Sequence, residues 1–240
     1  LKFAGYNSIN DQQFKQQIII NGSKNTLASK IDQILQLIHK HPQEFYSLVL
    51  LNQIFAQQMI IAPQKIMDEW NKLDKSLQSS EMGQWLYTKI LAANNLMKGN
   101  PFPSISFSTA SGAEFNSVDM KGANYLVIFG ATWCGPCKQN LTNLKPLLHK
   151  LDTTLFRVLH ITVSSKKADW EKMINTYALH KWTNVLDSSN NKTENIMQQF
   201  GITFIPFYLL VDANNIIQYN SYQENDGDLK KLLQRLEAFL

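Results

Sequence analysis

Cys134 and Cys137 are the only cysteines of the chain, and two residues separate them in the motif Trp-Cys-Gly-Pro-Cys. When such a motif opens a helix, the spacing brings both sulfurs within disulfide reach. A pair of this kind can act as a reversible dithiol–disulfide couple, as a structural staple or as half of a metal site. The surrounding sequence decides between these three chemistries.

The rest of the chain offers little support for a metal or haem site. A zinc site needs a second pair of Cys or His ligands, and none of the five histidines forms such a pair near the motif. They are His39, His41, His149, His160 and His180. A c-type haem site needs a histidine directly after the second cysteine, where Lys138 stands. A mini-protein stapled by disulfides has more cysteines in a shorter chain. We expect a redox couple, with neither a metal nor another cofactor.

The position of the motif predicts different roles for the two thiols. Cys134 would lie at the positive end of a helix, where unpaired N–H groups stabilise a thiolate, the attacking species. Cys137 would lie one turn inside, more deeply buried, and would resolve the mixed disulfide that Cys134 forms. Pro136 lacks an N–H group, which costs nothing in the first turn of a helix.

The elements around the motif predict a covered mixed sheet. An unbroken apolar run at 125–130 is typical of a central strand, and a helix is expected to follow over 134–150. Further strands are predicted at 156–163, 182–186, 206–211 and 216–219, and further helices at 168–180, 193–200 and 229–239. Asp212-Ala213-Asn214-Asn215 suits a hairpin turn, and Asp226 can cap the last helix. The order predicts an α/β unit of layered helices and sheet.

A boundary is expected near residues 98–103, where Gly99, Pro101 and Pro103 cannot continue a helix. We therefore predict a mainly helical domain over residues 1–98 and an α/β domain over 99–240. Helical spacing of apolar residues runs through 27–38, 48–59 and 85–97, and Pro63 suits the start of another helix. The first 25 residues show a weaker pattern, with a helix expected over 8–17 and a short strand over 18–20.

Charge and hydropathy exclude several classes of partner. The net charge of +4 comes from 23 basic and 19 acidic residues without a dense basic run, so nucleic-acid binding is not expected. No stretch approaches the roughly 20 apolar residues that span a bilayer. The chain begins at Leu1 rather than Met, which predicts that an upstream segment, such as a signal peptide, has been removed. No pattern predicts an oligomeric state.

Two stretches resemble the landmarks of thioredoxin-fold proteins. These are YLVIFGATWCGPC (125–137) and FGITFIPFYLLVD (200–212), and the resemblance spans roughly residues 101–240. It implies a thioredoxin-like fold in which Ile205-Pro206 is the cis-proline segment beside the cysteines. It also implies that the substrate disulfide is bound by Trp133, Gly135, Pro136, Ile205 and Pro206.

Other stretches narrow the resemblance to the TlpA/ResA-like reductases, which are related to the AhpC/TSA group. VSSKKADWEKMIN (163–175) and LVDANNIIQYN (210–220) are similar to that type, and HPQEFYSLVLLNQI (41–54) is similar to the helical region of Bacteroidetes members. The resemblance implies an exported protein of the periplasm or cell envelope, tethered to the membrane through the missing N-terminal segment, often as a lipoprotein. Its partners would be a disulfide-containing protein and a thiol electron donor.

The chain departs from both versions of the family's proton-handling acid. Thioredoxin carries a buried acid six residues before the first cysteine, where this chain has Ile128. ResA-type proteins carry a glutamate six residues after it, where this chain has Asn140. A buried acid assists deprotonation of the resolving thiol, so this step is expected to be slow. Lys138 is a candidate for compensation, although a solvated helix lysine is the simpler interpretation.

Three functions are compatible with a thioredoxin-like chain. The first is a disulfide reductase, favoured by the Gly-Pro pair between the cysteines, which resembles reducing thioredoxins. The alternative is a binding or scaffold module with a slow or vestigial couple, suggested by Ile128 and Asn140. A peroxiredoxin-type peroxidase needs Pro-x-x-x-Thr/Ser-x-x-Cys, and this pattern is absent here, where Gly130 and Ala131 lie four and three residues before Cys134. The reductase is therefore the leading interpretation.

Overall fold

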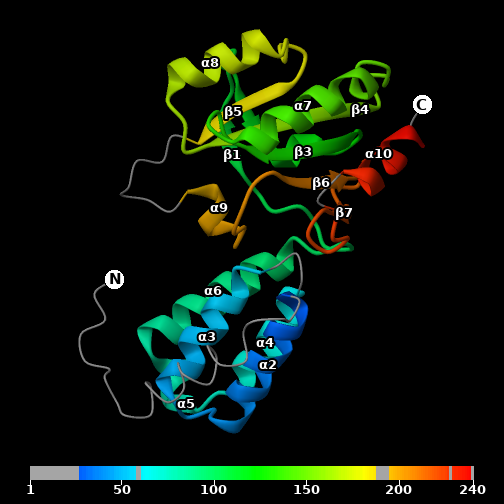
Figure 1. Cartoon of the computed structure of the whole chain (residues 1–240). Coiled ribbons are helices and arrows are strands. Elements are labelled where there is room, and N and C mark those ends of the chain that lie inside the picture. Colours follow the sequence, from blue (N-terminus) through cyan, green and yellow to red (C-terminus); the bar gives the residue numbers. More distant parts are fainter. Residues whose placement is uncertain (1–26, 58–60, 188–194, 227–228, 239–240) are drawn as a thin grey trace. The chain divides into compact units, whose positions relative to one another are not determined.

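The computed structural model describes residues 27–57, 61–187, 195–226 and 229–238 (Figure 1). The chain divides into two compact units, Leu1–Ile90 and Leu91–Leu240. This division falls within the helix α6 (Glu81–Asn95), whereas the sequence predicts a boundary after residue 98, which stays a prediction. The helix expected over 8–17 and the strand expected over 18–20 lie outside the described residues.

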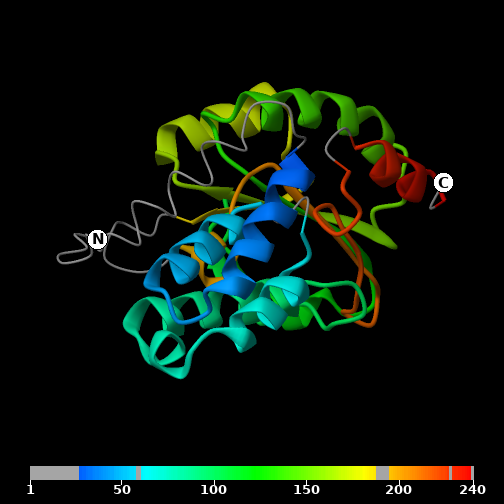
Figure 2. The same ribbon diagram turned by 60° about the horizontal axis from the view of Figure 1, so that its bottom comes forward.

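The first unit is helical, as predicted. It contains α2 (Leu27–Lys40), α3 (Phe45–Phe55), α4 (Pro63–Lys72), the short α5 (Lys75–Ser79) and the first part of α6. Helix α2 lies against α3 and α4 (Figures 1 and 2), and Pro63 occupies the first turn of α4. Apolar side chains of α3, among them Leu48, Leu51 and Ile54, are buried in its core. Only α5 was not predicted, because five residues carry too little helical periodicity.

A tight corner joins α5 to α6. The hydroxyl of Ser80 accepts a hydrogen bond from the Gly83 N–H at 3.1 Å, which caps α6. The indole N–H of Trp70 donates to the Gly83 carbonyl at 3.1 Å. A Cβ on Gly83 would lie 2.1 Å from the carbonyl oxygen of Leu77. Glycine is therefore required here because the backbone of the preceding turn occupies the space of a side chain.

The second unit is built on a five-stranded mixed sheet in the order β5-β4-β3-β6-β7. The strands are β3 (Asn124–Gly130), β4 (Phe156–Val163), β5 (Thr183–Asp187), β6 (Phe207–Val211) and β7 (Ile217–Asn220). Strands β3, β4 and β5 are parallel, while β6 runs antiparallel to both β3 and β7. All five strands agree with the predicted ones to within one residue at either end.

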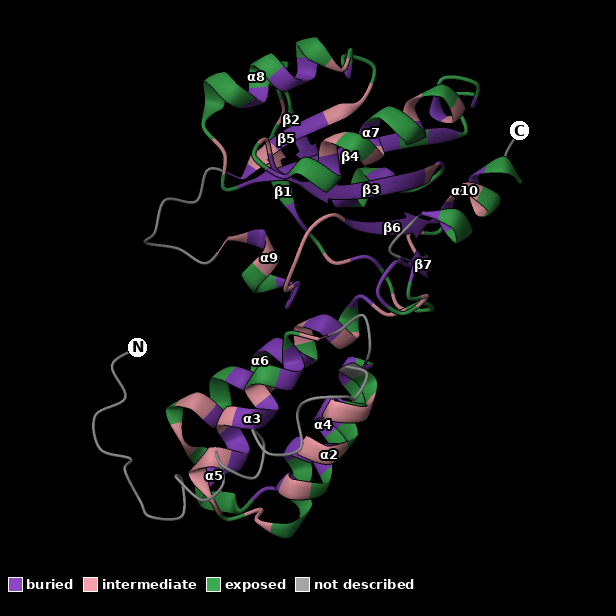
Figure 3. Cartoon of the chain, viewed as in Figure 1, coloured by how far each residue is buried: buried purple, intermediate pink, exposed green. Residues whose placement is uncertain are grey.

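Helices cover both faces of this sheet. On one face lie α7 (Gly135–Leu148), α8 (Lys167–Thr176) and α10 (Lys230–Glu237), and a continuous apolar core joins them to the strands (Figure 1). On the other face lies α9 (Ile196–Gln199), where Phe129 meets Phe200 and Phe207. Figure 3 shows the strands almost wholly buried and the outer sides of α7 and α8 exposed. An apolar run such as 125–130 is accounted for by this double cover.

Some predicted boundaries are wrong. Helix α8 ends at Thr176 rather than at residue 180, because Ala178 has a positive φ of 49° that stops the helix. The antiparallel hairpin of β1 (Ser106–Ser108) and β2 (Glu114–Asn116) and the 3₁₀-helix η1 (Ser117–Met120) were not predicted. The start of the helix predicted over 193–200 lies outside the described residues.

Asp226 caps the last helix, as predicted. Its carboxylate accepts hydrogen bonds from the backbone N–H groups of Lys231 at 3.1 Å and Leu232 at 2.7 Å. The same carboxylate accepts one from the hydroxyl of Tyr219 on β7, at 2.5 Å. Asp226 thus joins α10 to the edge strand of the sheet. No helix in the described ranges has both the length and the apolar character needed to cross a bilayer.

Candidate active site

The two cysteines lie where the central strand β3 passes into α7. Cys134 is the N-cap residue of α7, and its sulfur accepts a hydrogen bond from the Cys137 N–H at 3.2 Å. A disulfide joins Cys134 to Cys137. The free N–H groups and the dipole of the helix will stabilise negative charge on the Cys134 sulfur when the disulfide opens. The predicted placement of the motif at a helix start is confirmed.

The predicted difference in burial between the cysteines is wrong. Cys134 and Cys137 are each 5% exposed. The reason is that the disulfide holds the two sulfurs side by side, so that both share the cover of the first turn of α7 and the loop before it. A difference in solvent access between the two thiols can therefore arise only in the reduced protein, in which the disulfide is open.

Trp133, which precedes the first cysteine, is the most exposed large apolar residue of the described chain, at 64%. Its indole N–H donates to the carbonyl of Ser164 at 3.0 Å, which fixes the ring at the surface beside the motif. Gly135 and Pro136 are also exposed. These three predicted substrate-binding residues thus present one accessible surface next to the disulfide.

The peptide bond between Ile205 and Pro206 is cis, as the resemblance implies. Because Phe129 stands opposite Phe207 in the antiparallel pair of β3 and β6, the start of β6 lies beside the end of β3. Ile205 and Pro206 therefore lie at the same edge of the sheet as the cysteine motif, and both are partly exposed. Phe207 is a core residue at 1% exposure.

Ile128 and Asn140 occupy the two positions where relatives carry an acid. Ile128 is buried in the middle of a cross-strand row, formed by Asn184 of β5, His160 of β4, Ile128 of β3 and Tyr208 of β6. Asn140 donates a hydrogen bond from its side-chain amide to the Tyr208 hydroxyl at 2.9 Å. Burial raises the pKa of Tyr208 far above its ordinary value, so this hydroxyl stays neutral.

His160 is the member of the cross-strand row that borders the same space as the Cys137 sulfur. A methyl group on Gly130 would lie 3.6 Å from its Nε2 and 3.7 Å from Sγ of Cys137, so both atoms border one small space. The other ring nitrogen, Nδ1, lies 3.3 Å from Oδ1 of Asn184. Burial lowers the pKa of His160 from 6.5 to about 4, against the opposing effect of Asn184. The ring is thus neutral at pH 7.

This lowered pKa predicts a loss of stability in mild acid. Between pH 6.5 and pH 4 the unfolded chain binds a proton on His160 that the native protein does not bind. The free energy of unfolding of the oxidised protein should therefore fall by about 3 kcal/mol across this interval through His160 alone. Urea unfolding at pH 7 and pH 4.5 measures the decrease. In a His160→Asn variant the decrease should be smaller by most of this amount, and equal decreases would contradict the assignment.

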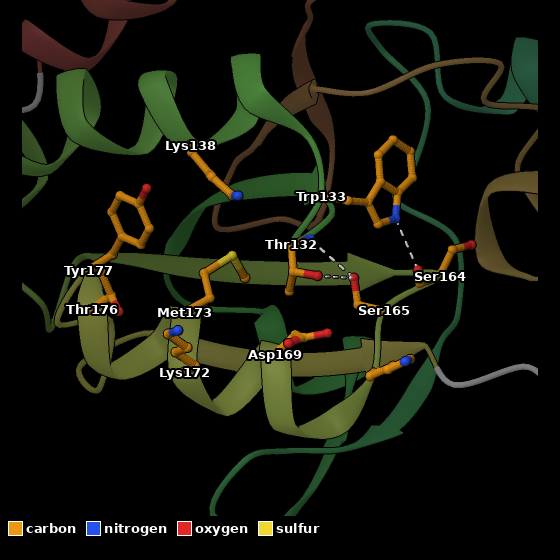
Figure 4. A pocket seen from close by; sticks show the side chains of 11 residues that line it. Thr132, Trp133, Lys138, Ser164, Ser165, Asp169, Lys172, Met173, Thr176 and Tyr177 are labelled. Atoms are coloured by element: carbon orange, nitrogen blue, oxygen red, sulfur yellow. Dashed lines mark hydrogen bonds between the residues drawn. The ribbon is translucent and has the colours of Figure 1, made fainter.

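A pocket of about 500 Å³ opens beside the cysteine motif, between the start of α7 and α8 (Figure 4). Trp133 and Lys138 line one side, and Asp169, Lys172 and Tyr177 of α8 and the turn that follows it line the other. The hydroxyl of Ser165 accepts a hydrogen bond from the backbone of Thr132 at 3.1 Å. Within the described ranges, no three His, Cys, Asp or Glu side chains gather as a metal site requires. The pocket offers mixed polar and aromatic contacts next to the disulfide.

Comparison with known proteins assigns the family. The sequence pattern of the Redoxin family matches residues 97–236, which is more than half of the chain. The chain belongs to the Redoxin family. Among curated proteins, this Redoxin-family chain is similar to the thiol-disulfide oxidoreductase ResA of Bacillus thuringiensis, at 23% identity over 160 residues. That alignment covers 64% of the chain and 90% of the relative. The thioredoxin-like protein YneN of Bacillus subtilis is 31% identical over 83 residues, covering 35% of the chain and 48% of YneN.

Solved structures show the same fold in other proteins. The thioredoxin domain of a thiol-disulfide oxidoreductase from Bacteroides vulgatus superposes with a TM-score of 0.51 at 21% identity, covering 60% of the chain and 97% of that domain. A thiol:disulfide interchange protein from a Bacteroides species gives a TM-score of 0.51 at 23% identity, covering 60% and 91%. The predicted thioredoxin-like fold and the TlpA/ResA-like relationship are confirmed. The protein is a thiol-disulfide oxidoreductase with the pair Cys134 and Cys137.

Sequence reasoning on this Redoxin chain did not single out the polar members of the cross-strand row. His160 is a buried titratable residue inside the mainly apolar strand Phe156–Val163, and this signal was available. Which residue faces Ile128 across the sheet depends on the strand register, which the sequence does not reveal. Asn184 and Tyr208 gave no comparable signal.

Proposed function

We propose that this oxidoreductase is a reductase of protein disulfides in the cell envelope. The thiolate of Cys134 attacks one sulfur of the substrate disulfide, forms a mixed disulfide and releases the first substrate thiol. The thiolate of Cys137 then attacks the sulfur of Cys134, releases the second substrate thiol and leaves the protein oxidised. A thiol electron donor returns the pair to the dithiol form.

One observation carries the exchange chemistry: the Cys134 sulfur is the N-cap acceptor of α7. The helix start favours the thiolate of Cys134, which is the attacking species. A helix start does not by itself set the direction of electron flow, because a strongly stabilised thiolate makes a pair more oxidising. The Gly-Pro pair, shared with reducing thioredoxins, decides for the reductase.

The substrate is proposed to lie across the exposed surface beside the disulfide. Trp133, Gly135 and Pro136 form its near side, and Ile205 and Pro206 form its far side. All five are accessible in part, whereas both cysteines are buried. A polypeptide chain that approaches a recessed disulfide needs such flanking contacts, which supports a protein rather than a small-molecule substrate.

The proposed location in the envelope, with a tether through an upstream segment, rests on the resemblance to TlpA/ResA-type reductases. A membrane-impermeant thiol reagent checks it. In intact cells whose outer membrane has been permeabilised, the reagent should label the reduced Cys134. Labelling only after lysis would place the protein in the cytoplasm and contradict the proposal.

A reductase must have a low potential. Equilibration of the pair against glutathione should give a value near −270 mV, as for thioredoxin, and not near −120 mV, as for DsbA. The reduced protein should also reduce the disulfides of insulin, measured by the turbidity of the released chains. A potential in the DsbA range would contradict the direction of electron flow that we propose.

The buried Ile128 and the amide of Asn140 favour a second candidate function. This function is a binding or scaffold module with a slow redox couple. Neither residue can accept a proton from Cys137. The insulin assay separates the two functions, because a scaffold with a vestigial couple would be no faster than a protein with both cysteines replaced by serine.

A further inference from the structure

We propose that His160 accepts the proton of the Cys137 thiol when the mixed disulfide is resolved, in place of the acid that relatives carry at position 128 or 140. His160 stands next to Ile128 in the cross-strand row, on the neighbouring strand β4. The inference rests on the proposed exchange chemistry and adds to it the residue that moves the proton.

His160 and Cys137 border one small space in front of Gly130. Because this residue has no side chain, Nε2 of His160 and Sγ of Cys137 face the same volume, at 3.6 Å and 3.7 Å from the place of the missing methyl group. When the disulfide opens, the Cys137 sulfur is free to turn about its Cα–Cβ bond within this volume. The nitrogen Nε2 borders the volume into which the proton must leave.

The hydrogen bonds of Asn184 fix the tautomer of the His160 ring. Asn184 donates both hydrogens of its side-chain amide, to the carbonyls of Leu179 at 2.8 Å and Trp182 at 2.9 Å. Its Oδ1 can therefore only accept, and the partner 3.3 Å away, Nδ1 of His160, must be the donor. A neutral ring with its hydrogen on Nδ1 has a lone pair on Nε2. The nitrogen that faces Cys137 is thus the basic one.

The surroundings of the ring favour this role. Among the described residues, Cys137 of α7 borders the same space as the ring, and Tyr208 of β6, whose hydroxyl is neutral, lies on the far side of Ile128 in the cross-strand row. Strand β5 supplies the amide of Asn184, and the ring of Trp182 packs edge-on against His160 at 6.2 Å between centroids. Helix α8 contributes apolar residues to the core on this face. In this buried and mostly apolar site, a proton on the imidazole of His160 is stabilised chiefly by the negative charge of the Cys137 thiolate from which it came.

In the resolving step, the Cys137 thiol gives its proton to Nε2 of His160. The resulting thiolate attacks the sulfur of Cys134. One S–S bond forms within the protein while the bond to the substrate breaks, so that two electrons pass to the substrate. Once the thiolate has been consumed, burial disfavours the imidazolium, and the proton passes to the leaving thiolate or to solvent. The ring returns to its neutral form.

The test uses the reduced full chain and an aromatic disulfide that releases a coloured thiolate at each step. The first release reports attack by Cys134 and depends on reagent concentration. The second release reports resolution by Cys137 and does not. His160→Asn retains a donor for Asn184 and removes Nε2, while Gly130→Ala places a methyl group in the shared space at ordinary contact distances.

We expect both variants to leave the first release within about twofold of wild type and to slow the second at least about tenfold at pH 7. The pH midpoint of the second release should move up by about one pH unit or more in His160→Asn. A purely structural role would not shift this midpoint. Thr162→Val is the matched control, because Thr162 is buried two residues further along β4 and its hydroxyl has no partner among the described residues. It should leave both releases unchanged.

Coincident profiles of the second release in wild type and His160→Asn would overturn the assignment of His160 while the proposed reductase stands. If His160→Asn does not fold, an unchanged second release in Gly130→Ala overturns it equally. A wild-type protein that shows the first release without the second overturns both the reductase and the role of His160.

Discussion

A Cys134→Ser variant is expected to lose insulin reduction almost completely. The sulfur of Cys134 is the N-cap acceptor at the start of α7, and no other cysteine than Cys137 exists in the chain. A serine hydroxyl can keep the capping hydrogen bond but is a far weaker nucleophile near neutral pH. The rate should fall on the order of a thousandfold or more, as for other covalent nucleophiles, measured as the initial rate of insulin precipitation.

The matched control is Cys137→Ser. This variant retains the attacking thiol, so it should lose turnover yet accumulate a mixed disulfide with the substrate. The adduct should be visible by gel electrophoresis without reductant and should disappear when a reductant is added. Accumulation of the adduct in Cys134→Ser instead would exchange the two roles and contradict the proposed order of attack.

A Gly83→Ala variant is expected to destabilise the helical unit. The new Cβ would lie 2.1 Å from the carbonyl oxygen of Leu77 and 2.8 Å from that of Gln78. Both are backbone atoms, so relief requires movement of the whole turn between α5 and α6. We expect a loss of roughly 3 kcal/mol or more. Helix propensity alone would predict the opposite sign, a gain of about 1 kcal/mol on replacing glycine by alanine within a helix.

Denaturant unfolding followed by circular dichroism measures this loss, and Thr88→Ala on the exposed side of α6 is the matched control. Insulin reduction by Gly83→Ala tests the proposal that residues 1–98 and 99–240 are separate domains. If the units fold independently, the variant should retain its activity at a denaturant concentration that unfolds its helical part. Parallel loss of activity and helical signal would contradict independent folding.

Most of the fold could be predicted from the sequence, because the apolar patterns of its main strands and helices are long and regular. The apolar run at 125–130 and the helical stripes upstream have clear patterns, and Asp226 marks its helix by an N-cap residue type. The β1–β2 hairpin was not predicted, since each strand has only three residues with a single apolar one, which is too short for alternation to be recognised. The end of α8 depends on the positive φ of Ala178. An alanine in the sequence does not predict this conformation.

The sequence predicts those parts of the candidate site whose residues are neighbours along the chain. Trp133, Cys134 and Cys137 form one local motif, and the cis bond before Pro206 follows from the resemblance. The equal burial of the two sulfurs depends on the closed disulfide and was predicted wrongly. The relation of His160 to Cys137 depends on strand register and on the missing side chain of Gly130. Neither is encoded in any short stretch of the chain.

The cross-strand row has a consequence for how such enzymes diverge. Ile128, Asn140 and His160 belong to β3, α7 and β4, yet these three elements surround the second cysteine. A proton acceptor can therefore change strands between lineages while the backbone stays the same. Homologous proteins can then keep one chemistry at positions that never align with each other. The small volume in front of Gly130, bordered by Cys137 and His160, is therefore the feature to compare between relatives, in addition to single alignment columns.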